Sequence, residues 1–179
     1  NQSAFVSDSI RGVLRTIFEG LFLAVIVMFL FLRSWRASLA VILTIPVTVA
    51  FSVLLCHLAG ITINVMSLGA MAASVGLIID DAIVIIEQIY REHEERPDEG
   101  RFDVVRSAIG DLFPAMVASS LSTIVIHFPF RMMSGLAGSF FKELSDTMQL
   151  TLVASFFVTW LLLPVLHLII GYRKTERKA

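Results

Sequence analysis

The amino-acid sequence predicts an all-α membrane protein, a polytopic helical bundle of five transmembrane helices. Of its 179 residues, 56% are hydrophobic and only 16% are charged, and the mean hydropathy of +0.83 is too high for a soluble domain of this length. Apolar runs that can cross a hydrocarbon layer of about 30 Å as helices recur along the chain. Short polar and basic segments separate these runs, as they separate the spans of a multi-pass membrane protein.

The composition also excludes several kinds of site. The formal net charge is −1 and the basic residues lie in short clusters between apolar runs, so we expect no nucleic-acid partner. The single cysteine, Cys56, allows no internal disulfide and no cysteine-based metal site, and we predict neither a metal nor another cofactor. The sequence begins at Asn1 and lacks the basic-then-apolar order of a signal peptide. We therefore interpret it as a piece of a longer chain.

The first third of the chain predicts an interfacial helix and two spans. Within 1–16, apolar side chains recur at helical spacing opposite a polar face, which is typical of a helix at the membrane surface that leads into a span. The first span, 17–32, ends at the basic turn 33–36, and the second, 37–57, follows at once. Pro46 removes a backbone donor and should kink the second span, which membrane helices tolerate when neighbours satisfy the freed carbonyl.

The rest of the chain alternates apolar runs with two interruptions. Residues 91–103 are the one long polar stretch, and we expect a loop outside the membrane there because Pro97 and Gly100 break helices. Residues 129–138 are expected to be irregular. The predicted transmembrane bundle covers 17–172, with spans at about 17–32, 37–57, 64–90, 104–128 and 141–170 and a tail at 173–179.

The basic residues predict the orientation of the bundle. The turn 33–36, the segment 91–106 and the tail 173–178 fall on one side of the membrane and hold ten of the fourteen Lys and Arg residues. The positive-inside rule makes that side cytoplasmic. The first span then starts outside and the tail 173–179 lies in the cytoplasm.

Two adjacent acids, Asp80 and Asp81, lie inside the third span. Insertion of one such acid near the centre of a membrane helix costs about 2.5–3.5 kcal/mol of free energy, so two adjacent acids imply a functional role. They point about 100° apart and so face different neighbours. The charge state of such a pair depends on its surroundings, because a low dielectric favours the protonated acid and a nearby cation favours the ionised one. This is the chemistry of a proton relay, and the alternative is a pair of structural acids that bond to a neighbouring helix.

Further polar residues near the pair have two interpretations each. Glu87 lies seven residues beyond Asp80, about 10 Å along the same helix face, and is either a stop on a possible proton path or an interfacial acid. The small polar face of the fourth span either hydrates the relay or packs against another helix. That face comprises Ser119, Ser120, Ser122 and Thr123.

The histidines receive no catalytic role. His127 has Met132 and Met133 nearby, and His and Met suit copper or silver. Their spacing is not diagnostic, however, and Met is common in apolar protein, so we assign no metal site. His57 and His167 lie at span ends, where we expect them to contact water.

The third span also carries a family pattern. Residues 76–91 read Gly-Leu-Ile-Ile-Asp-Asp-Ala-Ile-Val-Ile-Ile-Glu-Gln-Ile-Tyr-Arg. This pattern resembles the fourth transmembrane helix of the resistance-nodulation-division superfamily. The adjacent Asp residues, the Ala-Ile-Val that follows and Glu87 resemble the hydrophobe and amphiphile efflux branch, whereas heavy-metal exporters usually lack that pair. The resemblance covers nearly the whole chain and continues at 29–37, 44–47, 121–129 and 162–166.

The resemblance implies a role for the chain as part of the N-terminal half of a larger transporter. The five spans would be its second to sixth helices, and 1–16 would lead out of a periplasmic domain. It implies a drug/proton antiporter of the bacterial inner membrane, a secondary active transporter rather than an enzyme, in a homotrimer with a periplasmic adaptor and an outer-membrane channel. Asp80 and Asp81 would carry the proton and pair with a Lys from the second half, since no Lys occurs between Asn1 and Phe141.

Two alternatives stay open beside this expectation. A member of the superfamily can use proton flow to export lipid, metal or protein instead of drugs. The chain can also be a non-transporting membrane scaffold whose acids pair with a basic helix of a partner. Substrate identity lies outside this segment, because drugs bind in the periplasmic domain of the family.

Overall fold

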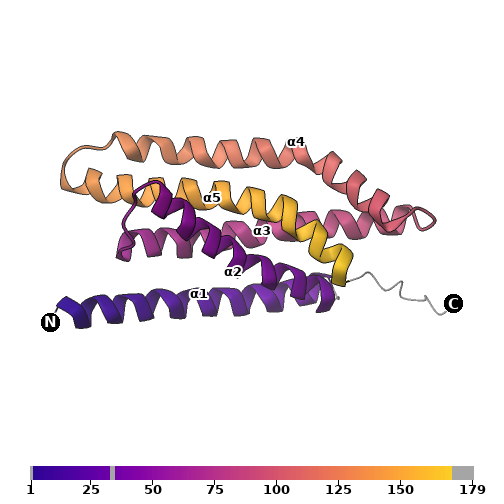
Figure 1. Cartoon of the computed structure of the whole chain (residues 1–179), viewed down its shortest axis with the longest axis horizontal. Coiled ribbons are helices and arrows are strands. Elements are labelled where there is room, and N and C mark those ends of the chain that lie inside the picture. Colours follow the sequence, from indigo (N-terminus) through magenta and orange to yellow (C-terminus); the bar gives the residue numbers. More distant parts are fainter. Residues whose placement is uncertain (1, 33–34, 171–179) are drawn as a thin grey trace.

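The structure is a computed structural model that describes residues 2–32 and 35–170, and these residues are almost entirely helical (Figure 1). No strand occurs in the described ranges, which confirms the all-α prediction. The elements are α1 (Gln2–Leu32), α2 (Trp35–Leu58), α3 (Val65–Glu95), α4 (Arg101–His127), the 3₁₀ helix η1 (Phe128–Met132) and α5 (Gly135–Ile170).

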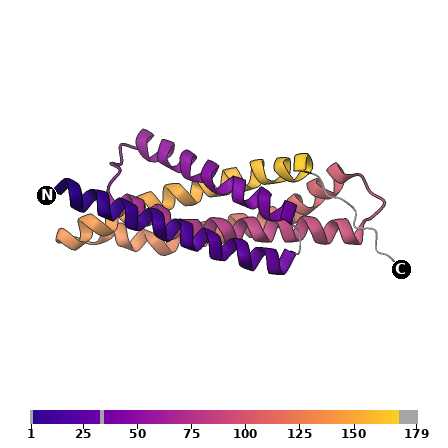
Figure 2. The same cartoon turned by 90° about the horizontal axis from the view of Figure 1, so that it is seen from below.

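Successive helices run in opposite directions along one bundle axis (Figures 1 and 2). The α2–α3 turn and η1 lie at one end, which we call the η1 end. The end of α1, the start of α2, the α3–α4 loop and the end of α5 lie at the other, which we call the loop end. Arg36 and the segment 91–106 therefore share the loop end, as the orientation argument requires. Arg33 and the tail 173–179 lie outside the described residues.

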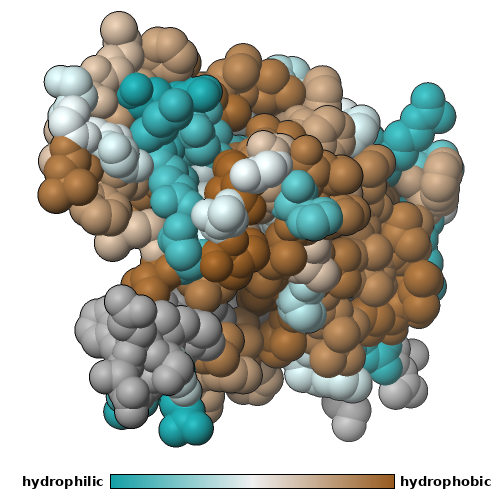
Figure 3. Space-filling model, turned by 60° about the vertical axis from the view of Figure 1, so that its left-hand side comes forward, coloured by the Kyte–Doolittle hydropathy of each residue, from teal (hydrophilic) through white to brown (hydrophobic). Residues whose placement is uncertain are grey.

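The helices have the dimensions of membrane spans. Four stretches are long and apolar enough to cross a bilayer, namely α2, α3, α4 together with η1, and α5. α1 contains the predicted first span, 17–32, as the continuation of one helix that begins at Gln2. Large apolar side chains are exposed on all five helices, and they cover much of the surface in Figure 3. The chain is a multi-pass membrane protein.

Two predicted boundaries are wrong. The expected loop 91–103 contains the last turn of α3 and the start of α4, so that only Arg96–Gly100 remains outside the helices. The residues before Pro97 are good helix formers and add ion pairs within the helix, Arg91 Nε to Glu95 Oε1 at 3.5 Å and Arg96 Nε to Glu92 Oε2 at 3.4 Å. The expected irregular stretch 129–138 is taken up largely by η1 and the start of α5.

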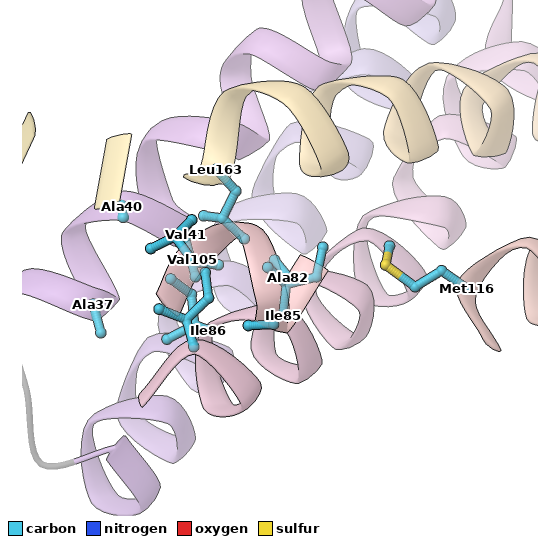
Figure 4. Packing of buried hydrophobic residues seen from close by; sticks show 11 residues of the cluster. Ala37, Ala40, Val41, Ala82, Ile85, Ile86, Val105, Met116 and Leu163 are labelled. Atoms are coloured by element: carbon cyan, nitrogen blue, oxygen red, sulfur yellow. The ribbon is translucent and has the colours of Figure 1, made fainter. Parts of the chain in front are cut away.

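The core lies where α3 meets α2, α4 and α5 (Figure 4). Between lipid tails, helices associate through packing rather than through exclusion of water. Small residues of α2 and α3 allow close approach, and branched residues fill the remaining space. The buried cluster comprises Ala37, Ala40, Val41, Ala82, Ile85, Ile86, Ile89, Val105, Ala108, Met116 and Leu163.

Candidate functional site

The candidate site lies on α3, whose start is fixed by a capping box. The Asn64 side-chain oxygen accepts hydrogen bonds from the backbone N–H groups of Met66 (2.8 Å) and Ser67 (3.0 Å), while the Ser67 hydroxyl accepts one from the Asn64 N–H (2.7 Å). The Asn64 amide and the Thr62 hydroxyl also donate to the Glu143 carboxylate of α5, the latter at 3.1 Å. These bonds anchor the first turn of α3 to α5.

One face of α3 is buried along its whole length. Its apolar residues recur at spacings of three and four, as a helix that packs against others on one side requires. Ile78, Ala82, Ile86 and Ile89 are each 0% exposed. This packing fixes the rotation of α3 and therefore the directions in which its acids point.

Asp80 projects from the opposite face of α3, which no other described helix covers. Asp80 is exposed and Asp81 is half-buried at the edge of the packed face. Among the described residues, neither carboxylate forms a hydrogen bond or an ion pair with another side chain. Gly76 lies one turn before Asp80, and a Cβ built on it meets nothing within 4 Å. The uncovered face therefore combines an unpaired carboxylate with a position that allows a neighbouring helix to approach closely.

Glu87 shares the uncovered face with Asp80. It is exposed, and the 3.6-residue period places it two turns farther toward the loop end. Asp81 points about 100° away from Asp80. The helix thus aligns Asp80 with Glu87 and separates Asp81 from both, as the sequence predicted.

The structure contradicts the expectation that His167 contacts water, whereas His57 is exposed as expected. His167 is only 5% exposed, and its ring stacks on His93 of α3 with 5.7 Å between centroids. The Tyr90 ring meets His167 edge-on at 5.6 Å. The signal was present in the sequence, because His93 continues the three-and-four spacing of Ile86 and Ile89 beyond the apolar run. The predicted span 64–90 stops short of His93 because the residues after Tyr90 are polar.

His127 forms hydrogen bonds that give it a structural role. The His127 ring Nδ1 lies 2.7 Å from the Thr123 carbonyl oxygen, and the Ser145 hydroxyl of α5 donates to the His127 carbonyl at 2.8 Å. Met132 and Met133 are exposed. The described residues contain no group of three or more His, Cys, Asp or Glu side chains placed to hold a metal ion.

The small polar face of α4 bonds in part to its own helix. Ser122 donates to the Ala118 carbonyl at 2.8 Å and Thr123 to the Ser119 carbonyl at 3.0 Å. Such bonds satisfy the hydroxyls locally. Within the described residues, no hydrogen bond joins these side chains to the acids of α3.

Comparison with known proteins gives a family match along the chain. The model of the AcrB/AcrD/AcrF family matches residues 1–178. The relatives include the swarming motility protein SwrC of Bacillus subtilis, 31% identical over 90% of this chain, and the multidrug resistance protein MdtF of Escherichia coli, 30% identical over 90%. The toluene efflux pump membrane transporter TtgE of Pseudomonas putida is 33% identical over 92%. This chain spans only 15 or 16% of the length of these relatives.

Proposed function

Because this chain belongs to the AcrB/AcrD/AcrF family of resistance-nodulation-division transporters, we propose that it is the transmembrane segment of a proton-driven efflux pump for drugs and other amphiphiles. It corresponds to the second to sixth helices of the N-terminal half of that pump. The observation that carries the proposal is the position of Asp80 and Asp81 in a membrane-length helix, with Asp80 on a face that the described residues leave uncovered. The names of MdtF and TtgE, which concern those proteins, support efflux as the activity.

The acids act as the proton relay through a change in charge. An ionised carboxylate in a dry helix bundle is held by a nearby cation, and protonation cancels that attraction, so the surrounding helices have two arrangements of different energy. The described residues contain one Lys, Lys142, which lies near the η1 end of α5. The described Arg side chains form no ion pair with Asp80 either. We therefore propose that the cation comes from the second half of the transporter, as a Lys on the helix that covers this face.

The membrane potential supplies the driving force. A proton that crosses the membrane releases about 2.3 kcal/mol per 100 mV, which changes a two-state equilibrium by tenfold or more. Glu87 extends the path toward the loop end, which we place in the cytoplasm because the basic residues gather there. The complete protein would lie in the bacterial inner membrane as a homotrimer, with a periplasmic adaptor and an outer-membrane channel as its partners.

The test is Asp80→Asn and Asp81→Asn in the full-length transporter, singly and together. Each change keeps the side-chain volume but fixes the group as neutral. We expect normal membrane levels and trimers, with export lost for every substrate, because the coupling step is common to all of them. Asp98→Asn in the exposed loop Arg96–Gly100 is the matched control and should export at the wild-type rate. A double Asn variant that exports against a gradient near the wild-type rate excludes the relay role.

A second cargo class has one specific observation in its favour. SwrC is named for swarming motility rather than for drug resistance. A transmembrane segment similar to this one therefore occurs in a protein whose name does not refer to drug export. The same proton-driven helices would then export a lipid or protein cargo. Both cargo classes require Asp80 and Asp81, and a panel of drugs and surfactant lipids tested on the full-length protein separates them. Membership of a transporter family disfavours the non-transporting scaffold.

A further inference from the structure

Two histidines, His93 of α3 and His167 of α5, meet at the loop end, and we call them the histidine pair. Their rings stack with 5.7 Å between centroids and 30° between planes. They are 8% and 5% exposed, respectively. Tyr90, one turn before His93, meets the His167 ring edge-on. The pair thus joins the last turns of two helices, and it consists of groups that titrate near neutral pH.

The His167 ring lies where a positive charge is unfavourable. Its Nε2 atom is buried and has no hydrogen-bond partner within the described residues. The Arg101 guanidinium of α4 and the His93 ring are both close enough to repel a positive charge on it. A buried cation that has like charges around it is strongly disfavoured. His167 is therefore neutral as long as the stack stays closed.

The acids at this end of the bundle do not offset that repulsion. Glu92 is buried, but its Oε2 lies 3.4 Å from the Arg96 Nε, which takes up its charge. The other described acids at the loop end are exposed to solvent, which screens them. α2 brings Arg36, another cation, to this end, and the residues of α5 around His167, 160–170, include no other charged side chain.

The stacked and the separated arrangements of the histidine pair bind different numbers of protons. Two positive rings with centroids 5.7 Å apart repel each other and Arg101, so the stack holds fewer protons than two free histidines. Once the helix ends separate, both rings face water and bind protons below about pH 6.5, as histidine ordinarily does. Each additional proton favours separation by about tenfold per pH unit below that value. Above about pH 7 both arrangements are neutral, and packing keeps the stack closed.

The histidine pair responds to the compartment at the loop end. Basic residues gather there, so the positive-inside rule makes this compartment the cytoplasm. The exposed loop Arg96–Gly100 begins three residues after His93, so water lies about one helical turn from the stack. At the η1 end, by contrast, the bonds between Asn64, Thr62 and Glu143 contain no histidine. A fall in cytoplasmic pH therefore acts on one of the two attachments between α3 and α5.

We propose that the histidine pair is a pH switch, which holds the loop end of α3 against α5 at neutral pH and releases it when the cytoplasm becomes acidic. The η1 end stays attached during this release. Where the proposed function holds, each transport cycle brings protons into the cytoplasm, so the release would act as feedback on the pump. The switch itself rests on contacts of α3, α4 and α5 and does not require that Asp80 or Asp81 carry protons.

Distances between spin labels on the full-length protein in lipid nanodiscs test the proposal. The loop-end labels replace exposed residues near the pair, in Glu94→Cys with Ile169→Cys, and the η1-end labels replace exposed residues of the same helices, in Met66→Cys with Ser139→Cys. All other cysteines are removed. Between about pH 8 and about pH 5, the separated fraction at the loop end should rise at least tenfold, while the η1-end distances stay constant. Unchanged loop-end distances, or an equal change at both ends, overturn the proposal.

The variant His93→Phe with His167→Phe identifies the groups that titrate. Phe keeps an aromatic ring but binds no proton, so the loop-end distances should no longer depend on pH. His57→Phe, which changes an exposed histidine near the η1 end, is the matched control and should keep the full response. A response that persists in the folded double variant overturns the assignment. If the double variant does not fold, His167→Gln replaces it, and a full response in that variant overturns the assignment equally.

The variant Asp80→Asn with Asp81→Asn separates this inference from the proposed function. The histidine pair is intact in that variant, so the loop-end labels should respond to pH as they do in the wild type, whatever the export assay shows. Loss of the response at normal protein levels would mean that the acids of α3 drive the movement, and it would overturn the switch.

Discussion

α3 and α4 are neighbouring helices of membrane length that differ in how much of them the bundle buries. In the most apolar stretch of α3, 50% of the residues are buried, whereas in that of α4 together with η1 only 6% are. Both stretches are apolar enough to span a bilayer, so hydropathy does not separate the two helices. The difference teaches that neighbouring helices hold α3 on about half of its surface, so that an acid on its remaining face has a fixed direction.

The difference in burial between α3 and α4 can be tested by shortening one apolar side chain on each helix. Ile86→Ala in α3 should lower the free energy of unfolding by about 2 kcal/mol, which is at the low end of the range for truncation of a buried Ile. The loss is small because α3, when separated from its neighbours, contacts lipid tails that are as apolar as the core. Val125→Ala in α4 removes a side chain that is 66% exposed and should change stability by less than about 0.5 kcal/mol. Unfolding of the full-length protein in a denaturing detergent series measures both. Equal losses would show that α4 is as tightly packed as α3.

The caps of the two helices offer a second, smaller test. Asn64→Ala removes the capping box of α3 and its bond to Glu143, and should cost about 1 kcal/mol. Gly100, the cap of α4, makes no side-chain bond, so Gly100→Asn should change stability by only a few tenths of a kcal/mol. The same detergent series reports the difference. A larger effect at Gly100 than at Asn64 would contradict the view that α3 is the better anchored helix.

The smallest expected effect concerns the hydroxyls of α4. Ser122→Ala and Thr123→Val remove groups that bond to their own helix, so stability should stay within about 0.5 kcal/mol and export should be unchanged. Export assays of the full-length transporter provide the measurement. A loss of export at normal protein levels would restore the hypothesis that this face hydrates the relay.

Patterns that repeat within a single helix predicted most of the architecture. The helical repeat and the apolar run lengths gave the all-α bundle, the four later spans and the shared face of Asp80 and Glu87. These features depend on spacing within one helix, which the sequence contains directly.

The wrong predictions concern two kinds of position. At some, the polarity of the residues indicated a loop while their spacing indicated a helix, and at others the outcome depends on how two helices pack together. The last turn of α3 is polar yet helical, because Glu92 and His93 continue its buried face and pack at the loop end. The burial of His167 was not predicted, because it depends on how α5 packs against α3. The stacking of His167 on His93 sets that arrangement, and no pattern within a single helix contains it.

The attachment of α3 to α5 at both ends has a mechanical consequence. Near the η1 end, Asn64 and Thr62 bond to Glu143, and near the loop end His93 stacks on His167. A helix attached to its neighbour at two distant points cannot tilt independently of it, so α3 and α5 should move together as one rigid unit. Spin labels paired across the two helices would then keep a constant separation throughout a transport cycle.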